Sequence, residues 1–123
     1  MSFHCVESES ATPGGVRFRT CVFPPHFATP PHQHDGAFFC LVLDGVSDQR
    51  SGSEERRRDR GRAYFYPAGE TQCERFGATG GRIFTVDLPS TDMRLPRGSS
   101  ELAGWPALRR LVCPRLLAQA TRS

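Results

Sequence analysis

The sequence predicts an all-β domain built from short strands, and three observations support this fold class. Polar and apolar residues alternate in several short stretches, as they do in half-buried strands. Prolines and glycines interrupt the chain of 123 residues at short intervals. Hydrophobic residues make up 37% of the chain, which is too much for a disordered polypeptide. Strands with this spacing are typical of a sandwich or a barrel, and the length fits one domain.

The strand pattern occurs four times in order along the chain. The first segment alternates in its first half. The second is a near-continuous apolar run that closes at Asp44-Gly45, a pair that commonly forms a turn. The third is aromatic and stops at Pro67, and the fourth alternates again after Gly80-Gly81. The predicted strands cover residues 16–23, 37–43, 62–66 and 82–88.

The pattern changes after about residue 98. Pro106 stands where the first turn of a helix accepts proline, and Leu108 and Leu111 recur near helical spacing. Pro114 lacks the N–H of a helical hydrogen bond and would kink or break this helix. We therefore expect a flexible N-terminus at residues 1–14, a barrel at 15–98 and a helical tail at 99–123.

Composition narrows the class of protein. No apolar run approaches the roughly 18 residues of a membrane helix, so we expect no membrane partner. The start, MSFHCVESES, lacks the basic and apolar regions of a secretory signal. Five cysteines stand far apart without a C-x-x-C pair, which favours free thiols over a disulfide framework. We expect a cytoplasmic protein.

The positive charge is weak evidence for a nucleic-acid surface. The net charge is +3, and Arg supplies every basic residue. The densest charged run, Glu54–Arg60, mixes both signs. Such runs are typical of a solvated loop, so we predict a loop there and no direct binding of nucleic acid by this chain.

The most informative local pattern is His32-Gln33-His34. Residues two apart in a strand point to the same face, so both imidazoles can enter one cavity. Two histidines placed in this way begin a metal site. The alternative is an accidental pair at the edge of a loop.

Two stretches around this pair resemble the motifs of the cupin superfamily. HQHDGAFFCLVLDG resembles the first motif, G-(x)5-H-x-H-(x)3–4-E-(x)6-G, and GRAYFYPAGETQCERF resembles the second, G-(x)5-P-x-G-(x)2-H-(x)3-N. Proline and glycine of the second motif build the tight turn that directs the next strand back into the barrel. The matching positions are His32, His34, Gly45, Gly61, Pro67 and Gly69.

A longer run, PAGETQCERFGATGGRIFTVDL, is similar to the sensor domains of AraC-type transcription regulators. Together the resemblances cover about residues 16–90. They imply a cupin barrel, that is, a double-stranded β-helix or jelly roll, here with a short C-terminal helical tail. They also imply that the barrel takes a small-molecule effector and forms a homodimer.

The sequence departs from the cupin motifs at two positions that supply metal ligands in the family. Phe38 stands at the Glu position and Gln72 at the second-motif His position. A catalytic site usually needs three good protein ligands. We therefore expect no cofactor, and a divalent transition metal held by His32 and His34 remains the alternative. Cys40 shares their face by strand parity and could replace a ligand.

Strand parity also predicts a cavity for a small molecule. Gly36, Phe38, Cys40 and Val42 would line it together with the two histidines. The sequence leaves open which face of the strand with Tyr64 and Tyr66 points inward. The candidate ligand-binding residues are His32, His34, Phe38, Cys40 and Gln72.

Three functions follow from these residues. The predicted one is a non-catalytic domain that senses a small molecule and dimerises; DNA would be read by a separate helix-turn-helix unit that this chain lacks. The second is a small stand-alone metal-dependent cupin enzyme that uses His32 and His34. The third is a barrel without a ligand, filled by Phe38. The leucines of the tail can contact a partner or pack on their own barrel.

Overall fold

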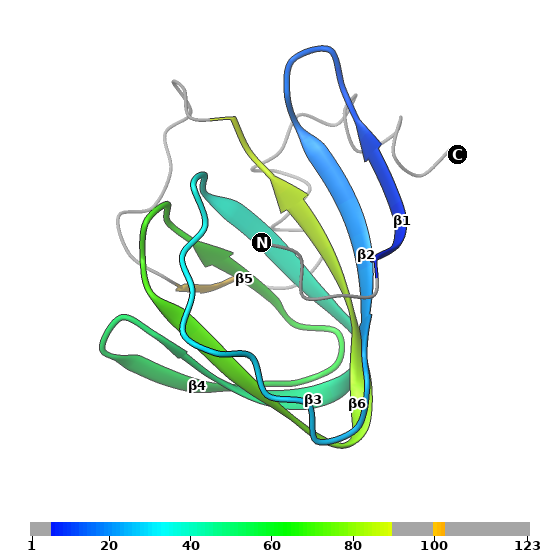
Figure 1. The fold of residues 1–123 in the computed structure, drawn as a ribbon, viewed down its shortest axis with the longest axis vertical. Coiled ribbons are helices and arrows are strands. Elements are labelled where there is room, and N and C mark those ends of the chain that lie inside the picture. The colour runs from blue at the N-terminus through cyan, green and yellow to red at the C-terminus, as the bar shows by residue number, and fades with distance from the viewer. Residues whose placement is uncertain (1–5, 90–99, 103–123) are drawn as a thin grey trace.

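A computed structural model describes residues 6–89 and 100–102 of the chain (Figure 1). The described residues form strands and contain no helix, which confirms the all-β prediction. All strand pairs are antiparallel. The strands are β1 (Val6–Ala11), β2 (Arg17–Phe23), β3 (Phe38–Ser51), β4 (Glu54–Arg58), β5 (Ala63–Tyr66), β6 (Gln72–Asp87) and β7 (Ser100–Leu102).

Two long strands, β3 and β6, run through both layers of the barrel (Figure 1). In one layer, the large sheet, the strand order is β1-β2-β6-β3-β5-β7. In the other layer, the small sheet, residues 47–51 of β3 pair with β4 on one side and with residues 72–76 of β6 on the other. Residues 26–32 add backbone hydrogen bonds along the second edge of β6. The barrel interior lies between the two sheets.

Glycines allow β3 and β6 to bend from one sheet into the other. Gly45 and Gly80 both have positive φ angles, of 82° and 66°. A Cβ atom on Gly45 would lie 2.0 Å from the carbonyl oxygen of Gly80, so a larger residue does not fit. The pairing of β3 with β6 shifts register on both sides of this point.

The bend corrects two sequence predictions, and strand β4 corrects a third. The predicted turn at Asp44-Gly45 is a bulge within a continuous strand, and β6 begins at Gln72 rather than after Gly80-Gly81. The predicted solvated loop at Glu54–Arg60 contains strand β4. Both faces of β4 carry charged residues, so the sequence shows no alternation of polar and apolar residues there.

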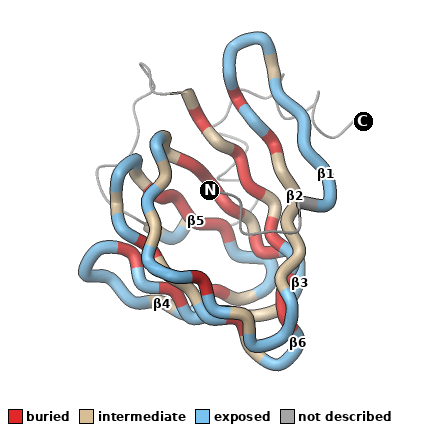
Figure 2. The backbone as a smooth tube through the Cα atoms, viewed as in Figure 1, coloured by how far each residue is buried: buried red, intermediate tan, exposed pale blue. Residues whose placement is uncertain are grey.

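Two apolar clusters lie on opposite faces of the large sheet. In Figure 2, β5 is coloured as buried along its length. This explains the near-continuous apolar run at 37–43, because a strand buried on both faces has no polar side. Tyr64 and Tyr66 belong to the inner cluster, which settles the question that the sequence left open. The inner cluster is Phe38, Cys40, Val42, Tyr64, Tyr66, Phe76 and Ile83, and the outer one is Val16, Phe18, Phe39, Phe65, Val86 and Leu88.

Both ends of the barrel differ from the predicted boundaries. Val6–Ala11, within the segment expected to be flexible, forms β1 and pairs with β2. Ser100–Leu102, within the expected helical tail, forms β7 and pairs with β5. Both are edge strands held by backbone pairing, so they need little of the apolar alternation that a sequence reveals. The rest of the predicted tail lies outside the described residues.

Within the described part of the chain, no helix has the length and apolar character needed to cross a membrane.

Candidate ligand-binding site

The interior of the barrel has a closed end, next to the bend of β3 and β6. The rings of Phe23 and Phe76 stack with centroids 4.4 Å apart, and Phe27 lies 6.0 Å from Phe23. Val42 and Ile83 belong to the same cluster. We call these five residues the closed end; their apolar side chains leave no polar group for a ligand.

The predicted histidine pair lies at the opposite, open end of the interior. His32 pairs with Gln72 through two backbone hydrogen bonds, of 2.9 and 2.8 Å. The backbone N–H of Gly69 donates to the carbonyl oxygen of His34 at 2.9 Å, so the Pro-x-Gly turn fixes this residue. The two imidazole rings lie 5.1 Å apart. They line a hollow of about 420 Å³ together with Arg19 and Asp87.

Phe38 and Gln72 lie beside the pair, as the motifs predict. The Phe38 ring lies 4.5 Å from the His34 ring and 5.1 Å from the Tyr66 ring. Gln72 is 2% exposed, and in the described residues its Nε2 atom has no hydrogen-bond partner. The structure thus brings four of the five predicted ligand-binding residues together at the open end.

Cys40, the fifth predicted residue, lies one inward position deeper along β3. It pairs in register with Tyr64 and Thr85. Arg58 donates to its Sγ atom at 3.5 Å, and burial raises the pKa of the thiol. Cys40 therefore belongs to the centre of the barrel and contacts a buried arginine.

These residues do not fit a bound metal ion. No group of three or more His, Cys, Asp or Glu side chains in the described chain is placed to hold one. Burial lowers the pKa of His34, and the neighbouring His32 lowers it further, so the ring is neutral near pH 7. A neutral ring nitrogen can accept a hydrogen bond from a ligand or bind a metal ion. The position beside it, however, holds the phenyl ring of Phe38, which offers no ligand atom.

A buried ion pair, which sequence reasoning missed, lies on the inner face of the small sheet, at the centre of the barrel. Arg58 of β4 is 2% exposed and bonds to Glu74 of β6 and to Ser47 of β3, the latter at 3.0 Å. Burial alone would lower the pKa of Arg58, but the Glu74 carboxylate raises it above its ordinary value. If strand β4 had been recognised, the alternation of its side chains would have placed Arg58 on the inner face. The run of charged residues gave no sign of that strand.

A second ion pair lies at the open end. Arg19 of β2 and Asp87 of β6 are 2.8 Å apart. Arg19 also pairs in register with Thr85, whose hydroxyl is buried without a partner among the described residues. Gln49 of β3 faces the interior from the small sheet, opposite Glu74. The open end of the interior therefore holds more polar groups than the cavity predicted from strand parity, which Gly36, Phe38, Cys40 and Val42 would line together with the two histidines.

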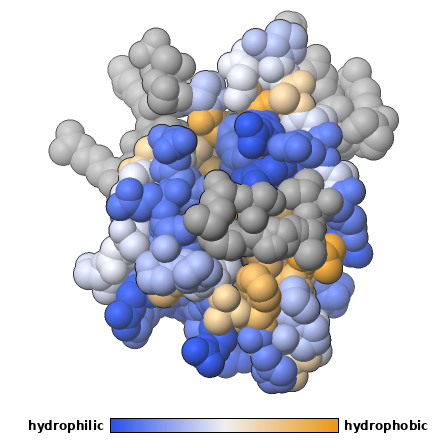
Figure 3. All heavy atoms as spheres, in the orientation of Figure 1, coloured by the Kyte–Doolittle hydropathy of each residue, from blue (hydrophilic) through white to orange (hydrophobic). Residues whose placement is uncertain are grey.

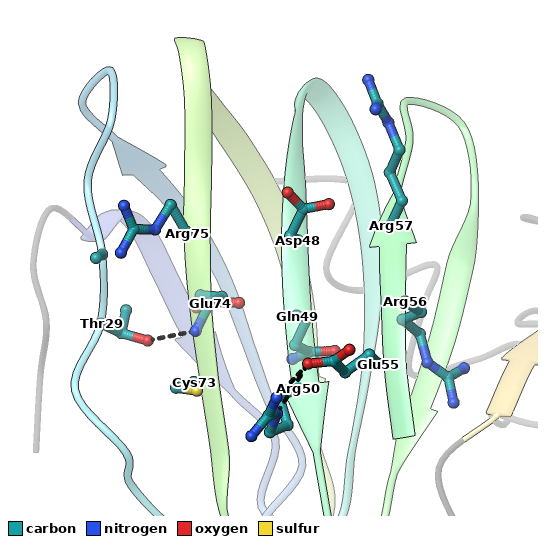
Figure 4. A pocket seen from close by; sticks show the side chains of 11 residues that line it. Thr29, Asp48, Gln49, Arg50, Glu55, Arg56, Arg57, Cys73, Glu74 and Arg75 are labelled. Atoms are coloured by element: carbon teal, nitrogen blue, oxygen red, sulfur yellow. Dashed lines mark hydrogen bonds and ion pairs between the residues drawn. The ribbon is translucent and has the colours of Figure 1, made fainter. Parts of the chain in front are cut away.

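A wider hollow of about 650 Å³ lies on the outer face of the small sheet (Figure 4). Arg50 turns toward Glu55 there and forms an ion pair with it, while Arg57 pairs with Asp59 at 3.4 Å. The charges of this hollow largely satisfy one another. On the face shown in Figure 3, most described side chains are hydrophilic, and a smaller apolar patch lies below the centre. We therefore place the candidate site at the open end of the barrel.

No protein-family model and no curated protein sequence matches the chain. Solved structures do match. KdgF from Halomonas sp. has a TM-score of 0.60 and 19% identity, over 72% of this chain and 81% of that one. A cupin superfamily protein from Desulfitobacterium hafniense has a TM-score of 0.59 and 12% identity, over 66% and 73%. A variant of oxalate decarboxylase from Bacillus subtilis has a TM-score of 0.58 and 13% identity, over 63% and 22%.

At these identities the likeness shows the fold alone. It agrees with the motif-based prediction and with the two facing sheets described above. The chain is an all-β cupin barrel.

Proposed function

We propose that the chain is a non-catalytic cupin domain that binds a small-molecule effector at the open end of the barrel. One observation carries the proposal: the ring of Phe38 packs 4.5 Å from that of His34, where the motif would supply a carboxylate. Gln72, which carries a neutral amide, pairs with His32 through the backbone and lies next to it. Two imidazoles, an amide and an aromatic ring suit an organic ligand better than a metal ion.

The proposal extends to the role of the domain. The run at residues 67–88 is similar to AraC-type sensor domains, so the effector would control a regulator, and the chain would act as a homodimer without touching DNA. The dimer contact is proposed for the leucines around Leu108 and Leu111, whose spacing in the sequence predicts an apolar helical stripe.

A first experiment separates binding from dimerisation. The full chain, purified without a histidine tag, is screened against small molecules by thermal shift, and its mass is measured by size exclusion with light scattering. We expect a ligand that raises the melting temperature, and a dimer that dissociates on truncation before Pro106. A monomer at high concentration would contradict the dimer, and a screen without any stabilising molecule would contradict the sensor role.

The alternative is a metal-dependent cupin enzyme. It is favoured by the His32 and His34 rings, which lie 5.1 Å apart at an open hollow. Oxalate decarboxylase, one of the structures with the same fold, is an enzyme by its name. This alternative predicts stoichiometric metal and turnover that the double substitution of both histidines by alanine abolishes.

A further inference from the structure

We infer that the ligand of the open end is a small neutral molecule that carries several hydroxyl, carbonyl or amide groups. The inference rests on the proposed ligand-binding function and adds the chemical class of the ligand. Two observations support it. Several buried polar atoms have no hydrogen-bond partner among the described residues, and the charged side chains of the interior form ion pairs with one another.

The unpartnered atoms come from three strand positions on the inner faces of the barrel. Gln72 Nε2, Thr85 Oγ1 and Gln49 Oε1 are buried and lack hydrogen-bond partners within residues 6–89 and 100–102. Gln72 shares the face of His32, which lines the hollow. Thr85 stands beside Arg19, which lines it too. Buried polar groups in proteins almost always have partners, so a molecule bound at the open end would supply partners to the Gln72 and Thr85 atoms. Gln49 also lines the hollow on the outer face of the small sheet.

The chemistry of these groups requires both donors and acceptors from the ligand. A threonine hydroxyl donates and accepts, and a glutamine amide presents either its oxygen or its NH₂ group. The buried Arg19 Nε, also without a partner in the described residues, can only donate. An apolar ligand would leave all of them unsatisfied. Hydroxyl, carbonyl and amide groups would satisfy them.

The ion pairs of the interior argue against a net charge on the ligand. Arg58 is paired with Glu74, and Arg19 with Asp87. Arg17 and Asp35 also line the hollow, but at exposed positions. An ionic ligand that entered the barrel would find both interior pairs already complete, and burying an unpaired charge is costly. The hollow of about 420 Å³ lies in the size range of small-molecule sites.

The test compares four sets of probes of similar size on the full chain, by thermal shift and then by calorimetry. The neutral set contains sugars, polyols and small amides. The anionic set contains sugar acids and hydroxy acids, the cationic set amino sugars and amines, and the apolar set toluene and cyclohexanol. We expect stabilisation by members of the neutral set. Thr85→Val should weaken the best neutral probe about fivefold, the value of one net hydrogen bond. Thr79→Val, the same change at an exposed position of β6, is the matched control.

The outcomes separate the inference from the function on which it rests. Stronger stabilisation by an anionic, cationic or apolar probe would overturn the inference and leave ligand binding standing. No stabilisation by any set would overturn the proposed function as well. If Thr85→Val weakened the neutral probe no more than Thr79→Val does, the assignment of the buried hydroxyl to the ligand would be wrong.

Discussion

The two ends of the barrel interior are built by the same two strands, yet their chemistry differs. At the closed end, Phe23 and Phe76 stack, and Val42 and Ile83 pack beside them. At the open end, side chains from the same sheets are polar, and several buried polar atoms lack partners in the described residues. From this difference we expect stability to be concentrated where β3 and β6 bend, and we propose the opposite end as the one that binds a ligand.

The largest expected effect on stability comes from removing an aromatic ring at the closed end. Phe76→Ala should destabilise the protein by about 4 kcal/mol, because it removes a buried ring and leaves a cavity. Leu43→Ala, at an exposed apolar position, should cost less than about 0.5 kcal/mol. Urea denaturation measures both. Similar losses for the two variants would contradict a stability centre at the bend.

The next effect comes from the ion pair between the two ends. Glu74→Leu should cost about 3 kcal/mol, because Arg58 would remain buried without its carboxylate. The double variant Arg58→Met with Glu74→Leu should recover much of this loss, since it buries no charge. If the double variant were less stable than the single one, the pair would contribute packing rather than charge compensation.

The smallest effect is a pH dependence at the open end. The pKa of His34 is lowered in the folded protein from 6.5, by burial and by His32. The unfolded chain therefore binds a proton more readily, and stability falls as the pH drops from about 6.5 through the folded pKa. His34→Gln should reduce this fall. Equal pH profiles for this variant and the unaltered chain in urea titrations would contradict the assignment.

The sequence predicted the fold because its signals are local. Alternation located β2 and the C-terminal part of β6, and an aromatic run located β5. The spacing of His32, His34, Pro67 and Gly69 indicated the barrel and its open end. The sequence did not predict the bend of β3 and β6, because Asp44-Gly45 is equally compatible with a turn. Only the pairing of β3 with β6, which bends at the same place, distinguishes the two.

The polar interior was missed for a different reason. Arg58 and Glu74 meet across the small sheet from distant positions in the chain, and a charged run in sequence gives no sign that one member is buried. Thr85 and Gln49 are uncharged polar residues in strands, and such residues are common at solvent-facing positions as well. Only the pairing of the strands shows that they face the same space as the histidines.

Metal content tests the central claim, that the open end is an organic-ligand site, most directly. Elemental analysis is made on the chain purified without a histidine tag and incubated with Fe(II), Mn(II), Ni(II) or Zn(II). A double variant, Phe38→Glu with Gln72→His, restores the missing motif ligands and is the positive control. We predict stoichiometric metal in the double variant and none in the wild type. Stoichiometric metal in the wild type that is lost when His32 and His34 are replaced by alanine would contradict the claim and favour the enzyme.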